Sequence, residues 1–323
     1  GGRVFFPDDR ATPEQREVAL KSRIEEIMAR EKVDSAAALK LLGNTDVRVI
    51  VALDAKSGAT AWEKPVDLTD CGMHILSLIA TKDVLVFCGA HSNGHYWPQF
   101  LSGEYASRRA TVLAQKDGSL LWTKAIGYRI RPLAIGDMLV AEPWAFDLHT
   151  GAQKMRENPV TGRSSIWEFE RPGHHCGTIS GCPNALLFRS YCMGYYDLAS
   201  ERGTEHFAGQ RPGCWINMIP ANGLVVVPEA SSGCLCLFSV HCTTVLAPRK
   251  QEKAWGMYSD RAPTTPVKHL SVNLGGPGDR TDSKGKLWLS FPRPNGRMQL
   301  ALGMSVSGLP GGGYFSKSAD TFQ

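Results

Sequence analysis

The chain has 323 residues, of which 43% are hydrophobic, so it is long enough to bury a substantial core. Its net charge of +5 is spread along the sequence, without a run of Lys and Arg interleaved with aromatic residues, which argues against nucleic-acid binding. No apolar stretch reaches the roughly 20 residues that a membrane-spanning helix needs.

The N-terminal residues 1–7 lack the apolar run and the small-residue cleavage site of a signal peptide, and an initiator Met is missing. We therefore expect a processed product or a part of a longer protein. The next residues predict a helix, because Thr12 is a capping residue, Pro13 suits the first turn and Gln15 completes a capping box. Apolar residues then recur at helical spacing: Leu20, Ile24, Ile27 and Met28.

A second short helix is predicted from Ser35 to Leu42, ending at Gly43. Residues 1–45 are thus predicted to be a helical segment, either inserted between two blades of the β-sheet fold predicted below or packed against one blade.

A strand, a tight turn and a second strand follow around residue 54. Asp54 can hydrogen-bond its own backbone, Gly58 can take positive φ without steric cost, and Trp62 opens the second strand with a large apolar surface to bury. The same pattern recurs at three places: Asp117-Gly118 to Trp122, Asp147 to Gly151, and Asp197 to Gly203.

A second series consists of a polar turn that runs into four apolar residues. Its members are 84–87, 138–141, 185–188 and 224–227. Two interleaved hairpin signals with a period of about 40–50 residues favour one four-stranded blade per repeat. The fold class predicted for residues 46–295 is therefore all-β, a β-propeller of about six to eight blades. The alternative is a β-sandwich in which the turns coincide by chance.

Three further segments complete the prediction. Residues 88–97 are too polar and rich in glycine for a strand, and predict a loop on one face of the ring. Residues 282–289 predict a last hairpin, Asp282 to Gly285 and then Trp288, that repeats the opening pattern. Residues 296–323 are glycine-rich, and we interpret them as an extension or a linker to a further module.

These residues carry a family resemblance. Leu53 to Gly58 followed by Trp62, with Asp117-Gly118 and Trp122, resembles the PQQ-like β-propeller repeat of quinoprotein dehydrogenases and of outer-membrane assembly lipoproteins. Three cysteine-containing segments resemble a narrower group, the propeller modules of large bacterial multi-domain proteins: 171–177, 211–217 and 233–236.

The resemblance implies a cofactor in the catalytic members of the family. They hold PQQ on a tryptophan floor beside a calcium ion with Glu, Asn and Asp ligands, under a disulfide between adjacent cysteines. This sequence contains no two adjacent cysteines, and no Asp or Glu stands out as the base that would accept a substrate proton.

Arg, Trp and amide side chains near blade-edge loops suit a polyhydroxylated or anionic ligand, because an aromatic surface stacks beneath it and charged groups bind its rim. The candidate ligand-binding or cofactor-binding residues are Trp97, Trp144, Arg171, Arg189, Arg211, Trp215, Asn217 and Glu229. The alternative is structural, with tryptophans packed between blades and arginines paired with acidic turns.

Two loops carry candidate metal ligands. Neutral His and thiolate Cys bind zinc or copper, and two loops that meet at the mouth of a propeller could supply several of them. The candidates are His91, His95, His174, His175 and Cys176. The alternative is that these histidines hydrogen-bond the backbone or a ligand.

Nine cysteines are many for a cytosolic protein of this size and predict an extracytoplasmic location, either periplasmic or secreted, with at least one disulfide. The candidates are Cys176, Cys182, Cys214, Cys234 and Cys236. Their pairing is open.

Two functions follow from the sequence. The first is a binding or scaffold module of a larger extracytoplasmic protein, with another domain, a partner protein or a glycan as its ligand. The second is a quinoprotein-type oxidoreductase that acts on alcohols or sugars with PQQ and calcium.

Overall fold

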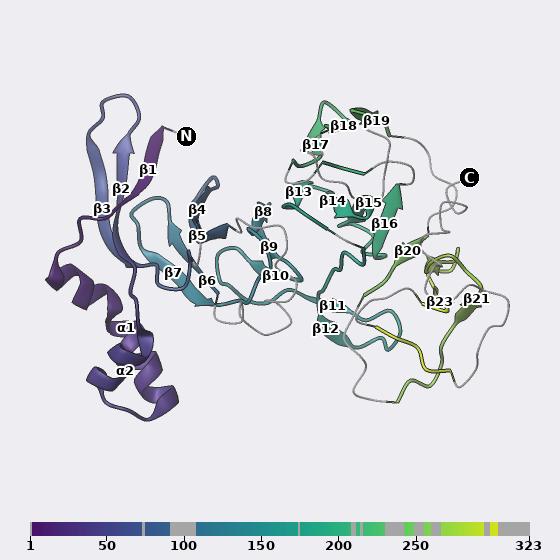
Figure 1. Cartoon of the computed structure of the whole chain (residues 1–323), viewed down its shortest axis with the longest axis horizontal. Helices are drawn as coiled ribbons and strands as arrows, with labels where there is room; N and C mark the ends of the chain where they lie inside the picture. Colours follow the sequence, from purple (N-terminus) through teal and green to yellow (C-terminus); the bar gives the residue numbers. More distant parts are fainter. Residues whose placement is uncertain are drawn as a thin grey trace. The chain divides into compact units, whose positions relative to one another are not determined.

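The computed structural model describes residues 2–72, 75–90, 108–173, 175–207, 211–213, 216–229, 242–248, 255–259, 266–293 and 298–302. The chain divides into two compact units, each described by itself below (Figure 1). Unit 1 comprises Gly1–Ser92, Trp97–Ala134 and Leu148–Gly151. Unit 2 comprises Asn93–Tyr96, Ile135–Asp147 and Ala152–Gln323.

Unit 1 opens with sheet 1, whose strand order is β1-β2-β3. The elements in chain order are β1 (Arg3–Asp8), α1 (Pro13–Glu31), α2 (Ser35–Leu42), β2 (Val47–Asp54) and β3 (Thr60–Asp67). Both helices are as predicted: Thr12 and Gln15 form the capping box of α1, and Asp34 caps α2 through the Ala37 N–H. Because β1 pairs with β2, the two helices lie between neighbouring strands of one sheet.

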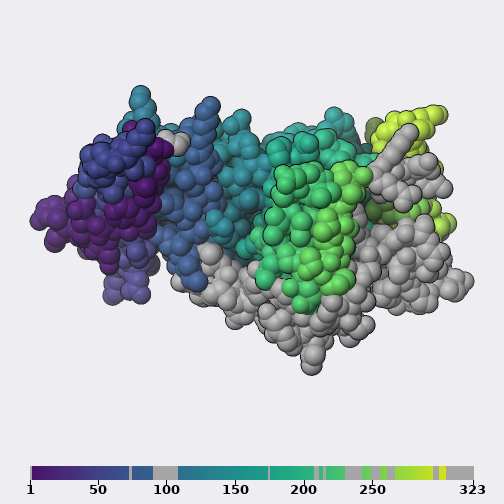
Figure 2. All heavy atoms as spheres, turned by 90° about the horizontal axis from the view of Figure 1, so that it is seen from above, coloured from purple at the N-terminus to yellow at the C-terminus, as the bar shows by residue number. Residues whose placement is uncertain are grey.

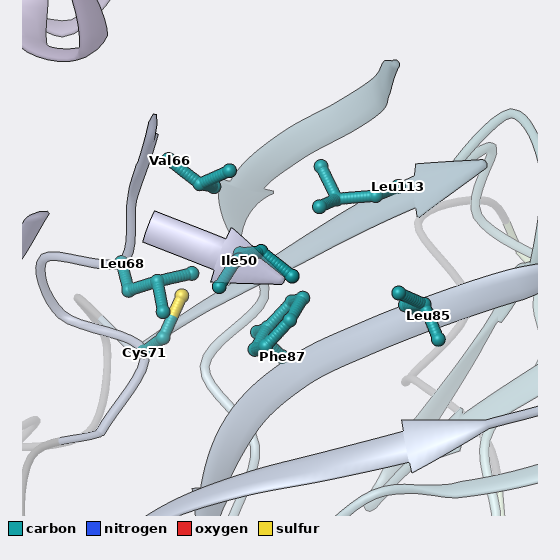
Figure 3. Close-up of a cluster of buried hydrophobic side chains, with 7 residues drawn as sticks. All are labelled: Ile50, Val66, Leu68, Cys71, Leu85, Phe87 and Leu113. Atoms are coloured by element: carbon teal, nitrogen blue, oxygen red, sulfur yellow. The ribbon is translucent and has the colours of Figure 1, made fainter. Parts of the chain in front are cut away.

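Sheet 2 is a four-stranded antiparallel meander, β4-β5-β6-β7. Its strands are β4 (Ile75–Ala80), β5 (Val84–Ala90), β6 (Arg109–Ala114) and β7 (Leu120–Ala125). One core lies between sheets 1 and 2, as Figure 3 shows. It consists of Ile50, Val66, Leu68, Cys71, Leu85, Phe87 and Leu113. Each of these seven residues is at most 8% exposed, so this core is closed to water.

Tryptophans join each sheet of unit 1 to the turn that follows it in the fold. The Trp62 Nε1–H donates to the Gln115 carbonyl at 3.2 Å, and its ring lies against Gly118, where a Cβ would stand 2.7 Å from Trp62. The Trp122 Nε1–H donates to the Leu148 carbonyl at 3.1 Å, and its ring lies against Gly151 in the same way. The two glycines have φ of +72° and +66°, so these turns require glycine both for backbone conformation and for space.

Unit 2 contains three successive antiparallel sheets. Sheet 3 is β8 (Leu133–Ile135), β9 (Met138–Ala141) and β10 (Trp144–Asp147), with the division between the units inside β8. Sheet 4 is β13 (Ser180–Cys182), β14 (Ala185–Ser190), β15 (Cys192–Asp197) and β16 (Thr204–Phe207), extended by β20 (Gly256–Met257). Sheet 5 is β17 (Ile219–Ala221), β18 (Leu224–Val227) and β19 (Thr244–Leu246).

Two smaller ladders complete unit 2. A hairpin joins β11 (Met155–Glu157) to β12 (Ser164–Ile166). The last sheet has the order β21-β23-β22, from β21 (Val272–Leu274), β22 (Arg280–Thr281) and β23 (Leu287–Phe291). Its β22–β23 hairpin is the one predicted at residues 282–289, whereas β21 pairs parallel to β23, a departure from the antiparallel pattern.

The all-β, β-propeller-like fold class predicted from the sequence is confirmed. The four predicted apolar runs lie in β5, β9, β14 and β18, which are second strands of sheets 2, 3, 4 and 5. The aspartate turns also form as expected: Asp54 accepts the N–H groups of Lys56 and Ser57 at 3.0 and 2.8 Å. The predicted loop 88–97 has its first residues in β5, and residues 91–97 lie outside the described ranges.

We expect Trp122→Phe to destabilise the protein by about 2 kcal/mol, because the smaller ring leaves a cavity beside Gly151 and the Leu148 carbonyl loses its donor. The matched control is Trp288→Phe, since Trp288 is 39% exposed and also donates an indole hydrogen bond, to Asp282. Urea unfolding followed by circular dichroism measures both variants. Equal losses in the two variants would contradict the structural role of Trp122.

Candidate functional site

The candidate site in unit 2 is built around Arg171, one of the predicted ligand-binding residues. Its guanidinium forms a bidentate pair with Glu142, with Nε–Oε1 at 2.9 Å and Nη2–Oε2 at 2.5 Å. Both side chains have 0% relative exposure. A third donor, Nη1, reaches the Gly177 carbonyl at 3.2 Å. The hydrogen bonds of Arg171 are thus made inside the protein rather than at its surface.

The segment from Arg171 to Thr178 gathers several predicted residues. The Gly173 N–H donates to the Ser190 Oγ at 2.9 Å, next to Arg189 in β14. Gly173 has no room for a side chain, because a Cβ there would lie 2.2 Å from the Tyr191 ring. At the other end, the Thr178 hydroxyl donates to Asn217 Oδ1 at 2.6 Å. The structure therefore brings Arg171 and Asn217 to one loop, whereas Arg189 is placed only as the residue before Ser190 in β14.

The remaining predicted ligand-binding residues are placed differently. Trp144 is half-buried, and its Nε1–H donates to Glu168 Oε1 at 3.2 Å. Arg211 is buried at 6% exposure, whereas Glu229 is exposed and its backbone N–H donates to the Thr243 hydroxyl. Trp97 and Trp215 lie outside the described residues.

Of the predicted metal ligands, only His175 and Cys176 are described, and His91, His95 and His174 fall outside. His175 Nδ1 lies 2.8 Å from the Gly173 carbonyl, and Cys176 is buried. Within the described ranges, no group of three or more His, Cys, Asp or Glu side chains is arranged to hold a metal.

The disulfide prediction needs a correction for the cysteines that are described. Six cysteines are described, and no disulfide joins any two of them: Cys71, Cys88, Cys176, Cys182, Cys192 and Cys242. Cys176 and Cys182 are therefore not bonded to each other. Cys176 is buried in the loop before β13, and Cys182 ends β13 opposite Ala185. Cys214, Cys234 and Cys236 lie outside the described residues. Burial raises the pKa of Cys88 in unit 1 to about 12, which keeps this thiol protonated.

A buried network of polar residues, which the sequence did not predict, connects separate segments of unit 2. Ser259 donates its hydroxyl to Glu170 at 3.1 Å and accepts a hydrogen bond from Arg156 at its carbonyl. Arg156 also donates to the Tyr196 hydroxyl at 3.0 Å. Glu170 is 7% exposed and Ser259 is 4% exposed, so this network is internal.

A second hub of this network is Asp279, at 2% exposure. It accepts the Tyr258 N–H at 2.7 Å, the Ser290 N–H at 2.8 Å, and a bidentate pair from Arg293 at 2.5 and 2.9 Å. These bonds connect Tyr258, the residue after β20, to Ser290 of β23 through one carboxylate.

One sequence signal points to Arg171 and its relatives. The dipeptide Arg-Pro recurs at residues 131, 171 and 211, at intervals of 40 residues. Each of these three copies precedes the first strand of a sheet: β8, β13 and β17. A fourth Arg-Pro, at Arg293, lies outside this spacing and follows β23. The three arginines differ in environment: Arg131 is exposed, with Nε donating to the Ser77 hydroxyl at 2.7 Å, whereas Arg171 and Arg211 are buried. The repeat therefore marks the same position in three sheets, ahead of the first strand. Whether the arginine is exposed or forms a buried ion pair depends on the residues that surround it.

One buried carboxyl in sheet 4, that of Glu205, has a raised pKa. Burial raises the pKa of Glu205, which is 3% exposed, while the hydrogen bond from the Tyr195 hydroxyl acts in the opposite direction. Arg202 lies 3.6 Å from the same carboxyl.

Antiparallel sheets that follow one another along the chain, with tryptophan-to-turn contacts in unit 1, define a β-propeller-like protein. No protein-family model and no curated protein matches the chain. Among solved structures, BamB from Moraxella catarrhalis is similar, with 17% sequence identity and a TM-score of 0.33. The match covers 57% of this chain and 51% of the BamB chain, so this chain spans about half the length of that structure.

We expect Arg171→Met to destabilise the protein by about 3–5 kcal/mol, because it leaves the Glu142 carboxylate buried without its partner. The double variant Arg171→Met with Glu142→Met should recover much of this loss, since no charge then remains inside. Arg131→Met, the exposed member of the repeat, is the control and should change stability by less than about 1 kcal/mol. A double variant as unstable as the single one would contradict the ion-pair explanation.

We expect the contribution of Glu205 to the free energy of unfolding to decrease as pH rises. Because its folded-state pKa is raised, the folded state holds this proton more tightly than the unfolded state. Its contribution is therefore most favourable below the unfolded value of about 4.3 and is lost as pH rises through the folded pKa. Unfolding midpoints from pH 4 to pH 8, a range of about four units around that titration, should show a flatter profile for Glu205→Gln than for wild type. Glu25→Gln, on the exposed face of α1, should leave the profile unchanged.

Proposed function

We propose that the chain is a binding and scaffold module of a larger extracytoplasmic bacterial protein, and that its ligand is a partner protein. The observation that carries this proposal is that two polar candidate residues form hydrogen bonds inside the protein. Arg171 and Trp144, which the sequence nominates for ligand binding, direct their hydrogen bonds to Glu142 and Glu168 within the fold. These hydrogen bonds therefore serve the folding of unit 2.

Apolar side chains at strand edges support a protein ligand over a polyhydroxylated one. In sheet 1, Val4 and Phe6 of β1 are 50% and 37% exposed. In sheet 2, Leu120 and Leu121 of β7 are 54% and 39% exposed. Both β1 and β7 are edge strands, since each is paired on one side only among the described strands. Apolar residues on strand edges suit contacts with another polypeptide, which supplies both apolar surface and backbone hydrogen bonds.

The extracytoplasmic location rests on the nine cysteines of the sequence. Along the described residues, no helix combines the length and hydropathy required to cross a bilayer.

The test uses the full chain, immobilised and exposed to an extract of extracytoplasmic proteins. We expect a captured protein that, once purified, binds the chain again with a Kd below about 10 µM. Leu121→Asp should weaken this binding, and the matched control Leu41→Asp, on exposed α2, should not. Saturable binding of an oligosaccharide without any such protein would overturn the choice of ligand.

A second assay separates the module from the enzyme. The chain is supplied with PQQ and calcium and offered a panel of alcohols and sugars with an artificial dye. We expect dye reduction no faster than without protein. Substrate-dependent and saturable reduction would overturn the proposal and favour the oxidoreductase.

A further inference from the structure

Three glycine turns share one backbone geometry, and their glycines, Gly58, Gly118 and Gly151, all belong to unit 1. The φ angles of these glycines are +72°, +72° and +66°. In each turn, the N–H four residues before the glycine donates to the carbonyl one residue after it, at 2.8, 2.8 and 2.7 Å. The strand pairs that contain the first two turns also shift register at the same place, five residues before the glycine. The three turns are therefore equivalent positions of a repeat.

Two of these turns are covered by an indole ring. Trp62 covers Gly118 and Trp122 covers Gly151, and a Cβ at either glycine would lie 2.7 Å from the ring. Each indole N–H donates to the backbone carbonyl three residues before its glycine, at 3.2 and 3.1 Å. Both glycines are buried as a result.

The Gly58 turn has the same geometry, but its surface is open. Gly58 is exposed, and a Cβ built there would meet no heavy atom of the described residues within 4 Å. The carbonyl three residues before it is that of Ala55, which is exposed too. Lys56 is the counterpart of Lys116 in the covered Gly118 turn, so the side chains of this turn are compatible with a cover.

The apolar surface beside the Gly58 turn is open as well. In sheet 1, Val4 pairs with Leu53, five residues before the turn glycine, and in sheet 2 the counterpart pair is Leu85 with Leu113. Leu85 and Leu113 are 0% exposed, because they belong to the core that sheet 2 forms with sheet 1. Val4 is 50% exposed and Leu53 is half-buried.

A second pair of counterparts on the same face differs in the same way. Phe6 pairs with the residue seven positions before Gly58, and Phe87 with the residue seven positions before Gly118. Phe6 is 37% exposed, whereas Phe87 is 0% exposed. Val51, which pairs with Phe6, is only 3% exposed, so the open surface is confined to β1 and the end of β2 next to the turn. In Figure 2, the purple and dark-blue atoms of this N-terminal part of the chain lie at the surface of unit 1.

The covered turns show which chemistry fits the open one. Two strands supply the cover: β3 with Trp62 and Lys64, and β7 with Trp122 and Lys124. In each strand the tryptophan covers the turn glycine, and the lysine two residues later contacts that glycine or donates to its carbonyl. A cover for the Gly58 turn therefore needs a strand with the sequence Trp-x-Lys, in which both side chains lie on one face.

We propose that the Gly58 turn and the apolar residues Val4, Phe6 and Leu53 form a docking site, called here the Gly58 site, for a Trp-x-Lys strand of a partner protein. The indole covers Gly58 and donates its N–H to the Ala55 carbonyl, and the apolar side chains of the partner strand pack on β1. This inference rests on the proposed function, because it takes the ligand to be a polypeptide, and it adds the sequence by which that polypeptide is recognised.

The probe is a synthetic peptide of residues 119–126, Ser-Leu-Leu-Trp-Thr-Lys-Ala-Ile, with blocked termini. It is added to the isotope-labelled full chain up to about 5 mM, above an expected Kd on the order of 1 mM. The amide signals of Lys56, Gly58 and Ala59 should shift and saturate in NMR spectra. Those of Gly118 and Gly151 should stay in place, because these turns already hold an indole. The same peptide with alanine in place of tryptophan is the control and should cause no saturable shift.

Gly58→Asn tests the site within the chain. Asn tolerates positive φ better than most residues with a Cβ, and its side chain fills the space that the indole needs, so the peptide affinity should fall at least about tenfold. Gly285→Asn is the matched control, since Gly285 has a φ of +80° and equally open space, and it should bind the peptide like wild type. Both variants should keep the thermal midpoint close to that of wild type.

Three results would overturn the Gly58 site: no saturable shift in the turn 54–58, equal shifts with the tryptophan-free peptide, or a Gly58→Asn chain that binds as tightly as wild type. The two proposals fail separately. The absence of any captured protein counts against the proposed function. A captured protein that binds Gly58→Asn as tightly as wild type counts against the Gly58 site alone.

Discussion

In unit 1, each sheet is positioned against the next turn by a contact between a tryptophan and the glycine of that turn. An indole ring supplies a large apolar surface, but its N–H must find an acceptor when it is buried. In both cases the acceptor is a backbone carbonyl of the turn, at Gln115 for Trp62 and at Leu148 for Trp122. The ring and the hydrogen bond together fix both the distance and the register between one sheet and the next turn, which hydrophobic burial alone would leave free.

Lysines reinforce the same geometry. Lys64 follows Trp62 by two positions and contacts Gly118 with its aliphatic stem, and Lys124 follows Trp122 by two positions and donates to the Gly151 carbonyl. Alternate residues of a strand share a face, so Trp and Lys at this spacing reach the same turn. Two residues in one strand therefore recognise one glycine turn.

In unit 2, buried ion pairs link segments that are far apart in the sequence. Glu142 and Arg171 come from a strand end and from the loop before sheet 4, and Asp279 connects segments around Tyr258, Ser290 and Arg293. Such pairs gain little net stability over apolar packing, because removing both charges from water is costly. Their geometry is strict, however, since an Arg–carboxylate pair needs two parallel hydrogen bonds. We infer that they specify which loop meets which strand.

Local signals in the sequence predicted the parts of the fold that depend on neighbouring residues. The capping box at Thr12, the turn at Asp54 and the apolar run of β18 each act within a few residues, and each forms as expected. The partner of Arg171 could not be predicted, because Glu142 lies 29 residues away and nothing local distinguishes it from Glu168 or Glu170. The parallel pairing of β21 with β23 is of the same kind, since it depends on segments that meet only in the folded chain.

Arg171 and Trp144 both donate hydrogen bonds to glutamates within unit 2, which motivates the search for a binding surface elsewhere. Among the described residues, Arg171 and Trp144 direct hydrogen bonds to glutamates inside the fold, whereas several apolar residues of the edge strands β1 and β7 and of sheet 5 face solvent. These described residues are arranged differently from a small-molecule site, in which polar groups converge in an apolar pocket. This arrangement supports the proposal that the chain binds another polypeptide, because exposed apolar sheet surface is stabilised by contact with more apolar surface.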